Sequence, residues 1–183
     1  MITHAPVIDF LSVHDEEQIA LVVQLARQIW SEHYLNIIGQ AQIDYMLARF
    51  QSSAAIAAQL REGYEYFLLQ HCGQYVGYAA IRAEADSRRL FISKLYLVDT
   101  VRGQGMGRAS LQYLARLADA RGLNGMWLTV NKNNPALNAY LKVGFVKTAD
   151  VVTDIGGGYV MDDFQLEWTP AVHPQTGSND NKY

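Results

Sequence analysis

Apolar residues recur along this chain with two different periods. In the first third they return every three or four positions, which is typical of amphipathic helices. A run rich in β-forming residues precedes these helices, and Gly39 and Gly63 stand where two of the helical patterns stop. The pattern predicts one strand followed by three helices, at residues 7–13, 14–36, 40–50 and 53–63.

From residue 64 on, most apolar runs are short and rich in aromatic and β-branched residues, as in strands. The run at residues 88–99 is nearly continuous in apolar residues, which indicates a strand covered on both faces. Two helical patterns interrupt these strands; one ends near Gly122, and the other has Pro135 in its first turn and Gly144 at its C-cap. The strands are expected at residues 64–71, 75–84, 88–99, 125–130, 145–153 and 158–168, and the second helix at 134–144.

The order of these elements predicts an α/β domain of mixed α+β type. Strands joined by short turns favour antiparallel pairing, whereas the strand, helix and strand between residues 90 and 130 require a right-handed parallel crossover. We expect a central, mostly antiparallel sheet of about seven strands with helices on both faces. This domain would span residues 1–169, and the polar segment 170–183 would form a mobile tail.

Composition narrows the classes of function. The chain has 183 residues, a net charge of −3 and a pI of about 5.9, so it lacks the basic excess of a general nucleic-acid-binding protein. No apolar run approaches the ~20 residues of a membrane span, and no signal peptide is evident at the N-terminus. We therefore expect no nucleic acid, membrane or metal as partner, and a cytoplasmic location. The single cysteine, Cys72, is expected to be a buried apolar residue.

The segment VRGQGMGRAS (101–110) carries the clearest chemical signal. Its three glycines, at 103, 105 and 107, lie between Arg102 and Arg108 and open a helix. Bare backbone lets a ligand approach closely, and the first N–H groups of a helix have no internal partners. These donors and the two guanidinium groups suit an anion, so the loop is predicted to bind a phosphate or pyrophosphate.

Two common phosphate-binding loops do not fit this segment. A Walker loop ends in Lys followed by Ser or Thr, and no such pair follows the glycines. A dinucleotide-binding loop needs a third glycine at the sixth position from Gly103, where this chain has Arg108. The segment instead matches the pattern [R/Q]-x-x-G-x-[G/A] at a helix start, as Arg102-x-x-Gly105-x-Gly107.

With a second element downstream, the sequence resembles the GNAT superfamily of acetyl-CoA-dependent N-acetyltransferases. That element is VNKNNPALNAYLKVGF (130–145), which is similar to the family's N-x-x-A-x-x-x-Y-x-x-x-G-F through Asn133, Ala136, Tyr140 and Gly144-Phe145. The resemblance covers residues 60–168 and implies acetyl-CoA as the acetyl donor. It also implies a GNAT-like sheet whose one parallel strand pair is splayed at the cofactor site, and it is compatible with a homodimer.

The resemblance assigns roles to individual residues. Tyr140 would be the catalytic acid, or would polarise the thioester sulfur by a hydrogen bond. A β-bulge in the strand at 88–99 would leave an N–H free, near Leu97, to stabilise the oxyanion. The cofactor would be bound by the strand residues Leu95, Tyr96 and Leu97, by the loop residues Arg102, Gly103, Gln104, Gly105, Met106, Gly107 and Arg108, and by Asn131 and Asn133.

The acceptor side is less determined by the sequence. Trp30, His33, Tyr34 and Asp162 are candidates for binding a small-molecule amine such as a polyamine. Lys94 argues against a polyamine, because the strand alternation puts it on the face of Leu90, Ile92 and Tyr96, where it would repel a cation.

The general base is also undetermined. Glu84, Asp162 and Asp163 are candidates, and a water chain to the solvent is equally compatible with the sequence. Asp162 and Asp163 are neighbours in a strand, so at most one of them can face the site. Two alternatives to a small-amine acetyltransferase stay open: acetylation of a protein N-terminus or lysine, and a non-catalytic acyl-CoA-binding regulatory module.

Overall fold

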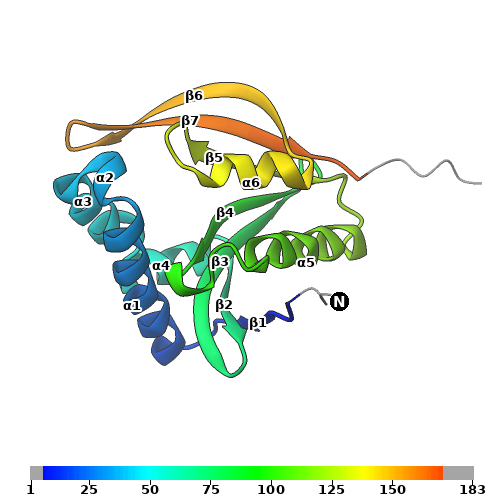
Figure 1. Cartoon of the computed structure of the whole chain (residues 1–183), viewed down its shortest axis with the longest axis horizontal. Helices are drawn as coiled ribbons and strands as arrows, with labels where there is room; N and C mark the ends of the chain where they lie inside the picture. Colours follow the sequence, from blue (N-terminus) through cyan, green and yellow to red (C-terminus); the bar gives the residue numbers. More distant parts are fainter. Residues whose placement is uncertain (1–5, 171–183) are drawn as a thin grey trace, which may run out of the picture.

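The computed structural model describes residues 6–170 and shows one seven-stranded sheet with helices on both faces (Figure 1). The order of the strands across the sheet is β1-β2-β3-β4-β5-β7-β6. The strands are β1 (Asp9–Ser12), β2 (Glu65–His71), β3 (Gln74–Glu84), β4 (Arg89–Leu97), β5 (Met126–Asn131), β6 (Val146–Gly156) and β7 (Tyr159–Trp168). The helices are α1 (Glu16–His33), α2 (Leu35–Ile38), α3 (Gln40–Phe50), α4 (Ser53–Arg61), α5 (Met106–Ala120) and α6 (Ala136–Val143), with a 3-10 turn at Asp99–Val101.

The predicted elements are confirmed, with small shifts at their ends. The helix expected to reach Asn36 ends at His33, and the short α2 occupies the gap before Gly39. The 3-10 turn ahead of the glycine loop was not predicted. Cys72 is exposed in the turn between β2 and β3, so its expected burial was wrong. The expected tail at 170–183 lies outside the described residues except for Pro170.

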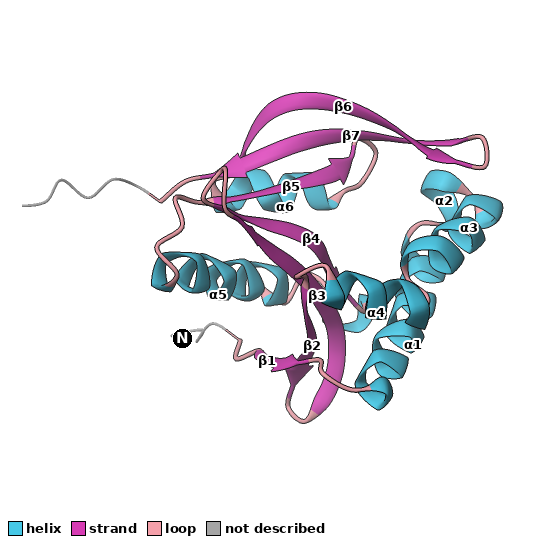
Figure 2. Cartoon of the chain, turned by 180° about the vertical axis from the view of Figure 1, so that it is seen from behind, coloured by secondary structure: helices cyan, strands magenta, loops and turns pink. Residues whose placement is uncertain are grey.

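The parallel pair β4–β5 is the exception in an otherwise antiparallel sheet. Its register contains only two pairs, Leu90 with Met126 and Phe91 with Trp127. The rings of Phe91 and Trp127 stack at 4.2 Å and close this end of the pair. Beyond them the two strands separate, and the predicted mixed sheet with a splayed parallel pair is confirmed (Figure 2).

Helix α1 covers one face of the sheet because its apolar residues recur at helical spacing. Ile19, Val22, Ala26 and Ile29 are buried along one side of the helix. Its N-terminus is fixed by a capping box, in which Asp15 accepts a hydrogen bond from the Gln18 N–H at 2.8 Å and the Gln18 side chain accepts one from the Asp15 N–H. Helices α5 and α6 pack on the opposite face, against β4 and β5.

A β-bulge in β4 decides which side chains face α1. Ala80 pairs with Lys94, whereas Ile81 pairs with Ile92, so Ser93 is the extra residue. A bulge was expected in this strand, with the free N–H near Leu97; the bulge lies at Ser93, and the N–H near Leu97 stays a prediction. Because the bulge shifts the alternation by one residue, Lys94 does not share a face with Ile92 as the plain alternation predicted.

Lys94 is buried, with 7% exposure, on the side of α4. Its Nζ donates a hydrogen bond to Gln59 Oε1 at 2.8 Å and lies 5.3 Å from the ring centre of Tyr66. Lys94 does not line the cavity described below, whereas its neighbours Ser93 and Leu95 do. Within residues 6–170, no helix combines the length and apolar character needed to cross a membrane.

The burial of Lys94 predicts a pH dependence of stability. Burial lowers the pKa of Lys94 from 10.5 to about 8. Between these values the unfolded chain binds a proton that the folded chain does not, so the free energy of unfolding rises with pH. We expect the free energy of unfolding to rise by about 1–2 kcal/mol between about pH 8 and 9.5, before exposed tyrosines ionise near pH 10.

Urea unfolding of the wild type and of Lys94→Met across this pH range measures the effect. Met fills a similar volume without a charge, so the variant should lose the rise and be more stable than the wild type at neutral pH. An equal pH dependence in both proteins would contradict the assignment to Lys94.

Candidate active site

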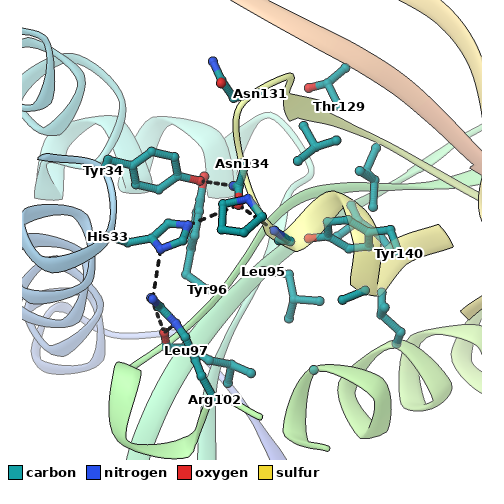
Figure 3. A pocket seen from close by; sticks show the side chains of 18 of the residues that line it. His33, Tyr34, Leu95, Tyr96, Leu97, Arg102, Thr129, Asn131, Asn134 and Tyr140 are labelled. Atoms are coloured by element: carbon teal, nitrogen blue, oxygen red, sulfur yellow. Dashed lines mark hydrogen bonds between the residues drawn. The ribbon is translucent and has the colours of Figure 1, made fainter. Parts of the chain in front are cut away.

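A cavity of about 750 Å³ opens where β4 and β5 separate. One end is lined by the glycine loop and the start of α5, and the walls come from β4, β5 and α6 (Figure 3). The other end lies under α1, α2 and α3 and reaches β7. The cavity therefore connects the two faces of the sheet.

The glycine loop forms the first end of the cavity. Gly105 is the N-cap of α5 with a φ of +84°, and Gly103 has a φ of +75°, so both need the left-handed conformation that glycine adopts without strain. The first backbone bond into the helix runs from the Ala109 N–H to the Gly105 carbonyl, so the N–H groups of residues 106–108 have no partner within the helix. This end is suited to an anion.

The side chains around the loop are not all directed at the cavity. Gly103, Gly105, Gly107, Arg102 and Arg108 line it. Met106 is buried in the protein, and the Gln104 side chain donates a hydrogen bond to the Thr100 carbonyl at 2.8 Å. Residues 104 and 106 can therefore contribute only backbone groups to a ligand.

The guanidinium of Arg102 is already engaged by the protein. It donates to the Leu97 carbonyl, through Nη2 at 3.0 Å, and to His33 Nδ1 at 2.9 Å, and it forms an ion pair with Asp99. These contacts use several of the N–H donors of Arg102, which also lines the cavity; its predicted role in binding a phosphate stays a prediction. Arg108 is exposed and forms no ion pair with the described residues.

His33 has a defined tautomer. An arginine only donates hydrogen bonds, so Nδ1 of His33 accepts from Arg102 and Nε2–H donates to Asn134 Oδ1 at 3.1 Å. Burial, with a smaller contribution from the Arg102 charge, lowers the pKa of His33. The ring is therefore neutral at physiological pH.

Asn134 connects the two sides of the cavity. It is 7% exposed, and its Nδ2 donates to the Tyr34 hydroxyl at 3.0 Å. Its Oδ1 also accepts the Ala136 N–H at 2.9 Å, at the start of α6. These contacts link α1 to α6 across the gap between β4 and β5 (Figure 3).

Asn134 was not among the predicted site residues, whereas Asn133 was. The side chain of Asn133 is exposed and outside the cavity, and its N–H donates to Asn131 Oδ1 at 2.9 Å. Asn131 itself lines the cavity, as predicted. An asparagine that precedes Pro135 at a helix start is a capping signal, which could have identified Asn134.

Tyr140 lies on the α6 wall. Its ring packs edge-to-face against Phe145 at 5.7 Å, and its hydroxyl is directed into the cavity (Figure 3). Burial raises the pKa of Tyr140 to about 12. The phenol is neutral at any physiological pH and is available as a hydrogen-bond donor.

Trp30 and Tyr34 form an aromatic wall at the second end of the cavity. Their rings stack at 4.6 Å, and the Trp30 N–H donates to the Tyr78 hydroxyl at 3.2 Å. Tyr96 packs against the same pair, at 5.5 Å from Trp30. The indole N–H is thus used inside the protein, and Trp30 offers a ligand only its ring.

Of the three acidic residues that the sequence offered as candidates, only Asp163 lines the cavity. Asp162 is half-exposed, forms an ion pair with Lys132 at 2.5 Å and lies outside the cavity. Its neighbour Asp163 lines the cavity and is 4% exposed, so Asp163 takes the position expected for Asp162. Glu84 accepts the Trp127 N–H at 2.9 Å and also lies outside. Among residues 6–170, no group of three His, Cys, Asp or Glu could hold a metal ion.

A family model places the chain among known proteins. Residues 23–145, more than half of the chain, match the model described as the acetyltransferase (GNAT) family. The chain belongs to the GNAT family. This match includes both the glycine loop and the helix that carries Tyr140.

Relatives and solved structures agree with the GNAT assignment. A streptothricin acetyltransferase of Streptomyces lavendulae is 38% identical over 74 residues, which are 40% of this chain and 39% of that protein. An uncharacterised N-acetyltransferase of Mycobacterium tuberculosis is 36% identical over 96 residues, 51% of this chain and 61% of that one. The chain thus matches less than two thirds of the length of either relative.

The fold is that of solved GNAT structures. The PaiA N-acetyltransferase of Thermoplasma acidophilum, in complex with coenzyme A, has a TM-score of 0.70 at 18% identity, over 89% of this chain and 99% of that one. A variant of the spermidine N-acetyltransferase SpeG of Vibrio cholerae has a TM-score of 0.65 at 13% identity, over 88% and 93%. A ribosomal-protein alanine N-acetyltransferase of Escherichia coli has a TM-score of 0.66 at 16% identity, over 93% and 98%.

The contacts of Asn134 in this GNAT chain predict unequal effects of two neighbouring substitutions. Asn134→Ala leaves the Tyr34 hydroxyl and the His33 Nε2–H without their partners in the interior, so it should lower the free energy of unfolding by about 1–3 kcal/mol. Asn133→Ala removes an exposed side chain and should change it by less than about 0.5 kcal/mol. Denaturant unfolding of both variants measures this difference, and equal effects would mean that the network does not contribute to stability.

Proposed function

We propose that this chain transfers the acetyl group of acetyl-CoA to the primary amine of a small cationic molecule. The observation that carries the proposal is the single cavity between β4 and β5, which has an anion-binding helix start at one end and the Tyr140 hydroxyl in its wall. Acetyl-CoA carries a thioester at one end and a diphosphate further along the molecule, so it would need both the anion-binding helix start and the hydroxyl.

The cofactor-binding groups are mostly backbone. The N–H groups of residues 103–108 would donate hydrogen bonds to the diphosphate of acetyl-CoA, and the Arg108 guanidinium would pair with its negative charge. Gly107 supports this role, because a Cβ there would meet only Leu97 Cδ1, at 3.9 Å, on the cavity wall. A larger side chain at Gly107 would enter the space in which the cofactor is proposed to lie.

The edge of β4 that faces the gap would bind the pantetheine arm of acetyl-CoA, which connects the diphosphate to the thioester. The Val98 N–H donates to the Val76 carbonyl of β3, so alternation directs the N–H and C=O groups of Leu95 and Leu97 toward the gap. The Leu97 carbonyl is held by Arg102, which leaves the Leu95 groups and the Leu97 N–H. We assign the Leu97 N–H as the oxyanion donor, although the bulge that was expected to free it lies at Ser93.

Tyr140 would act on the departing sulfur. A thiol has a pKa of about 8.5, well below the pKa of about 12 of Tyr140, so full proton transfer to the thiolate runs uphill. A hydrogen bond from the phenol that strengthens as charge develops on sulfur fits these values better. When bound, acetyl-CoA supplies the activated acetyl group and the thiolate leaving group.

A small amine fits the acceptor side better than a protein does. The second end of the cavity is lined by residues of α1, α2 and α3 and contains a buried carboxylate, which would suit the amine of a small cationic molecule. The relative named as a streptothricin acetyltransferase supports the same choice. A cytoplasmic location, a homodimer and a single domain over residues 1–169 stay predictions.

The function is tested by thiol release from acetyl-CoA in the presence of polyamines, streptothricin and peptides with free N-termini. Release that depends on a small cationic amine supports the proposal. Turnover of peptides alone would favour the protein-acetylating alternative. Tight CoA binding without turnover on any acceptor would indicate an acyl-CoA-binding regulatory module.

Substitution of Tyr140 tests its catalytic role. Tyr140→Phe keeps the packing on Phe145 but removes the hydroxyl, so turnover should fall by about 10²–10⁴-fold while CoA affinity, measured by calorimetry, stays unchanged. Tyr113→Phe is a matched control, because Tyr113 stacks on Phe10 at 3.9 Å and does not line the cavity. If Tyr140→Phe turned over at the wild-type rate, the Tyr140 hydroxyl would have no catalytic role and the side chain would contribute only to packing.

A further inference from the structure

The carboxylate of Asp163 is an unusual feature of the cavity. It is 4% exposed, and its Oδ1 has no hydrogen-bond partner among the described residues. Burying a carboxylate without a cationic partner costs free energy, and such groups are commonly retained where they bind a ligand. Burial raises the pKa of Asp163 above its usual range, and a hydrogen bond from Thr129 partly offsets this effect. Of the two neighbouring charges, Asp162 raises the pKa and Lys132 lowers it, each by less.

The position of Asp163 is fixed by the sheet. It pairs in register with Asn131 of β5, and directly paired residues of antiparallel strands point to the same face. Met161, two residues before it on β7, also lines the cavity and shares this face. Gln42 of α3 donates a hydrogen bond to the Val160 carbonyl of β7 at 3.2 Å, so α3 contacts β7 next to Met161, and Asp163 belongs to this end of the cavity.

The charges around the cavity are divided between its two ends. Of the described residues that line it, Asp163 is the only carboxylate, whereas Arg102, Arg108 and Lys142 are cations. His33, which lies between the ends, is neutral for the reasons given above. An anionic ligand is favoured at one end and a cation at the other.

We propose that Asp163 binds the acceptor as an alkylammonium ion and restricts the enzyme to small cationic amines. The ammonium would donate a charge-assisted hydrogen bond to the free carboxylate oxygen. This proposal rests on the proposed acetyl transfer for its biological meaning, but the binding of the amine does not require turnover.

Asp162 provides a matched control one residue away. Both are aspartates of β7, but Asp162 is directed to the other face, where it pairs with Lys132 at 2.5 Å. Asp163→Asn and Asp162→Asn each remove one negative charge without changing the size of the side chain. Only the first removes a charge from the cavity.

The experiment is calorimetric titration of putrescine, spermidine, propylamine and streptothricin into the CoA-bound wild type and both variants, with KM measured where turnover occurs. We expect Asp163→Asn to weaken amine binding at least ~10-fold with unchanged CoA affinity, and Asp162→Asn to stay within about twofold. Amine binding within twofold of wild type in Asp163→Asn, equal losses in both variants, or a wild type that binds none of these amines would overturn the proposal. Binding without acetylation would contradict the proposed function and leave Asp163 as the amine-binding residue.

Thermal unfolding separates this role from a structural one. Removing a buried charge that has no partner should leave the melting temperature of ligand-free Asp163→Asn equal to or above that of the wild type. A marked fall in melting temperature, or failure of the variant to fold, would show that the carboxylate stabilises the fold and would overturn the proposal.

Discussion

The rest of the structure depends on the separation of β4 and β5 after a single stacked pair, Phe91 and Trp127. Continuous pairing would fill the middle of the sheet with backbone hydrogen bonds and leave no cavity. The separation exposes the N–H and C=O groups of Leu95 and Leu97, which must find other partners because buried backbone groups are costly when unpaired. Arg102 satisfies the Leu97 carbonyl, and the other groups define an edge to which an extended ligand can bind.

The two ends of the cavity are held in place by different elements. The glycine loop is fixed by the start of α5, whereas Asp163 is fixed by the register of β5 and β7. Between them, the contacts from Arg102 through His33 and Asn134 to Tyr34 tie α1 to the strand ends and to α6. This arrangement keeps an anion-binding end and a carboxylate apart, which fits the proposed transfer from an anionic donor to a small cationic amine.

Much of the fold, and the elements proposed to bind acetyl-CoA, could be predicted from the sequence because local patterns determine them. Helical periodicity, the glycines of the loop and the motif around Tyr140 each depend on residues close together in the chain. The bulge at Ser93 could not be predicted in the same way, since it is defined by pairing with β3, and it changed the face assigned to Lys94. Asn134 and Asp163 line the cavity, whereas Asn133 and Asp162 were the residues predicted to bind ligands and Asp163 was named only as a candidate base. In a turn or strand, a one-residue change reverses the side-chain direction.

The most direct measurement is a crystal structure of this protein with coenzyme A. We predict that the diphosphate accepts hydrogen bonds from the N–H groups of residues 103–108 and that the thiol lies between β4 and β5, within hydrogen-bonding distance of the Tyr140 hydroxyl. A diphosphate bound elsewhere, or a thiol remote from Tyr140, would contradict this prediction.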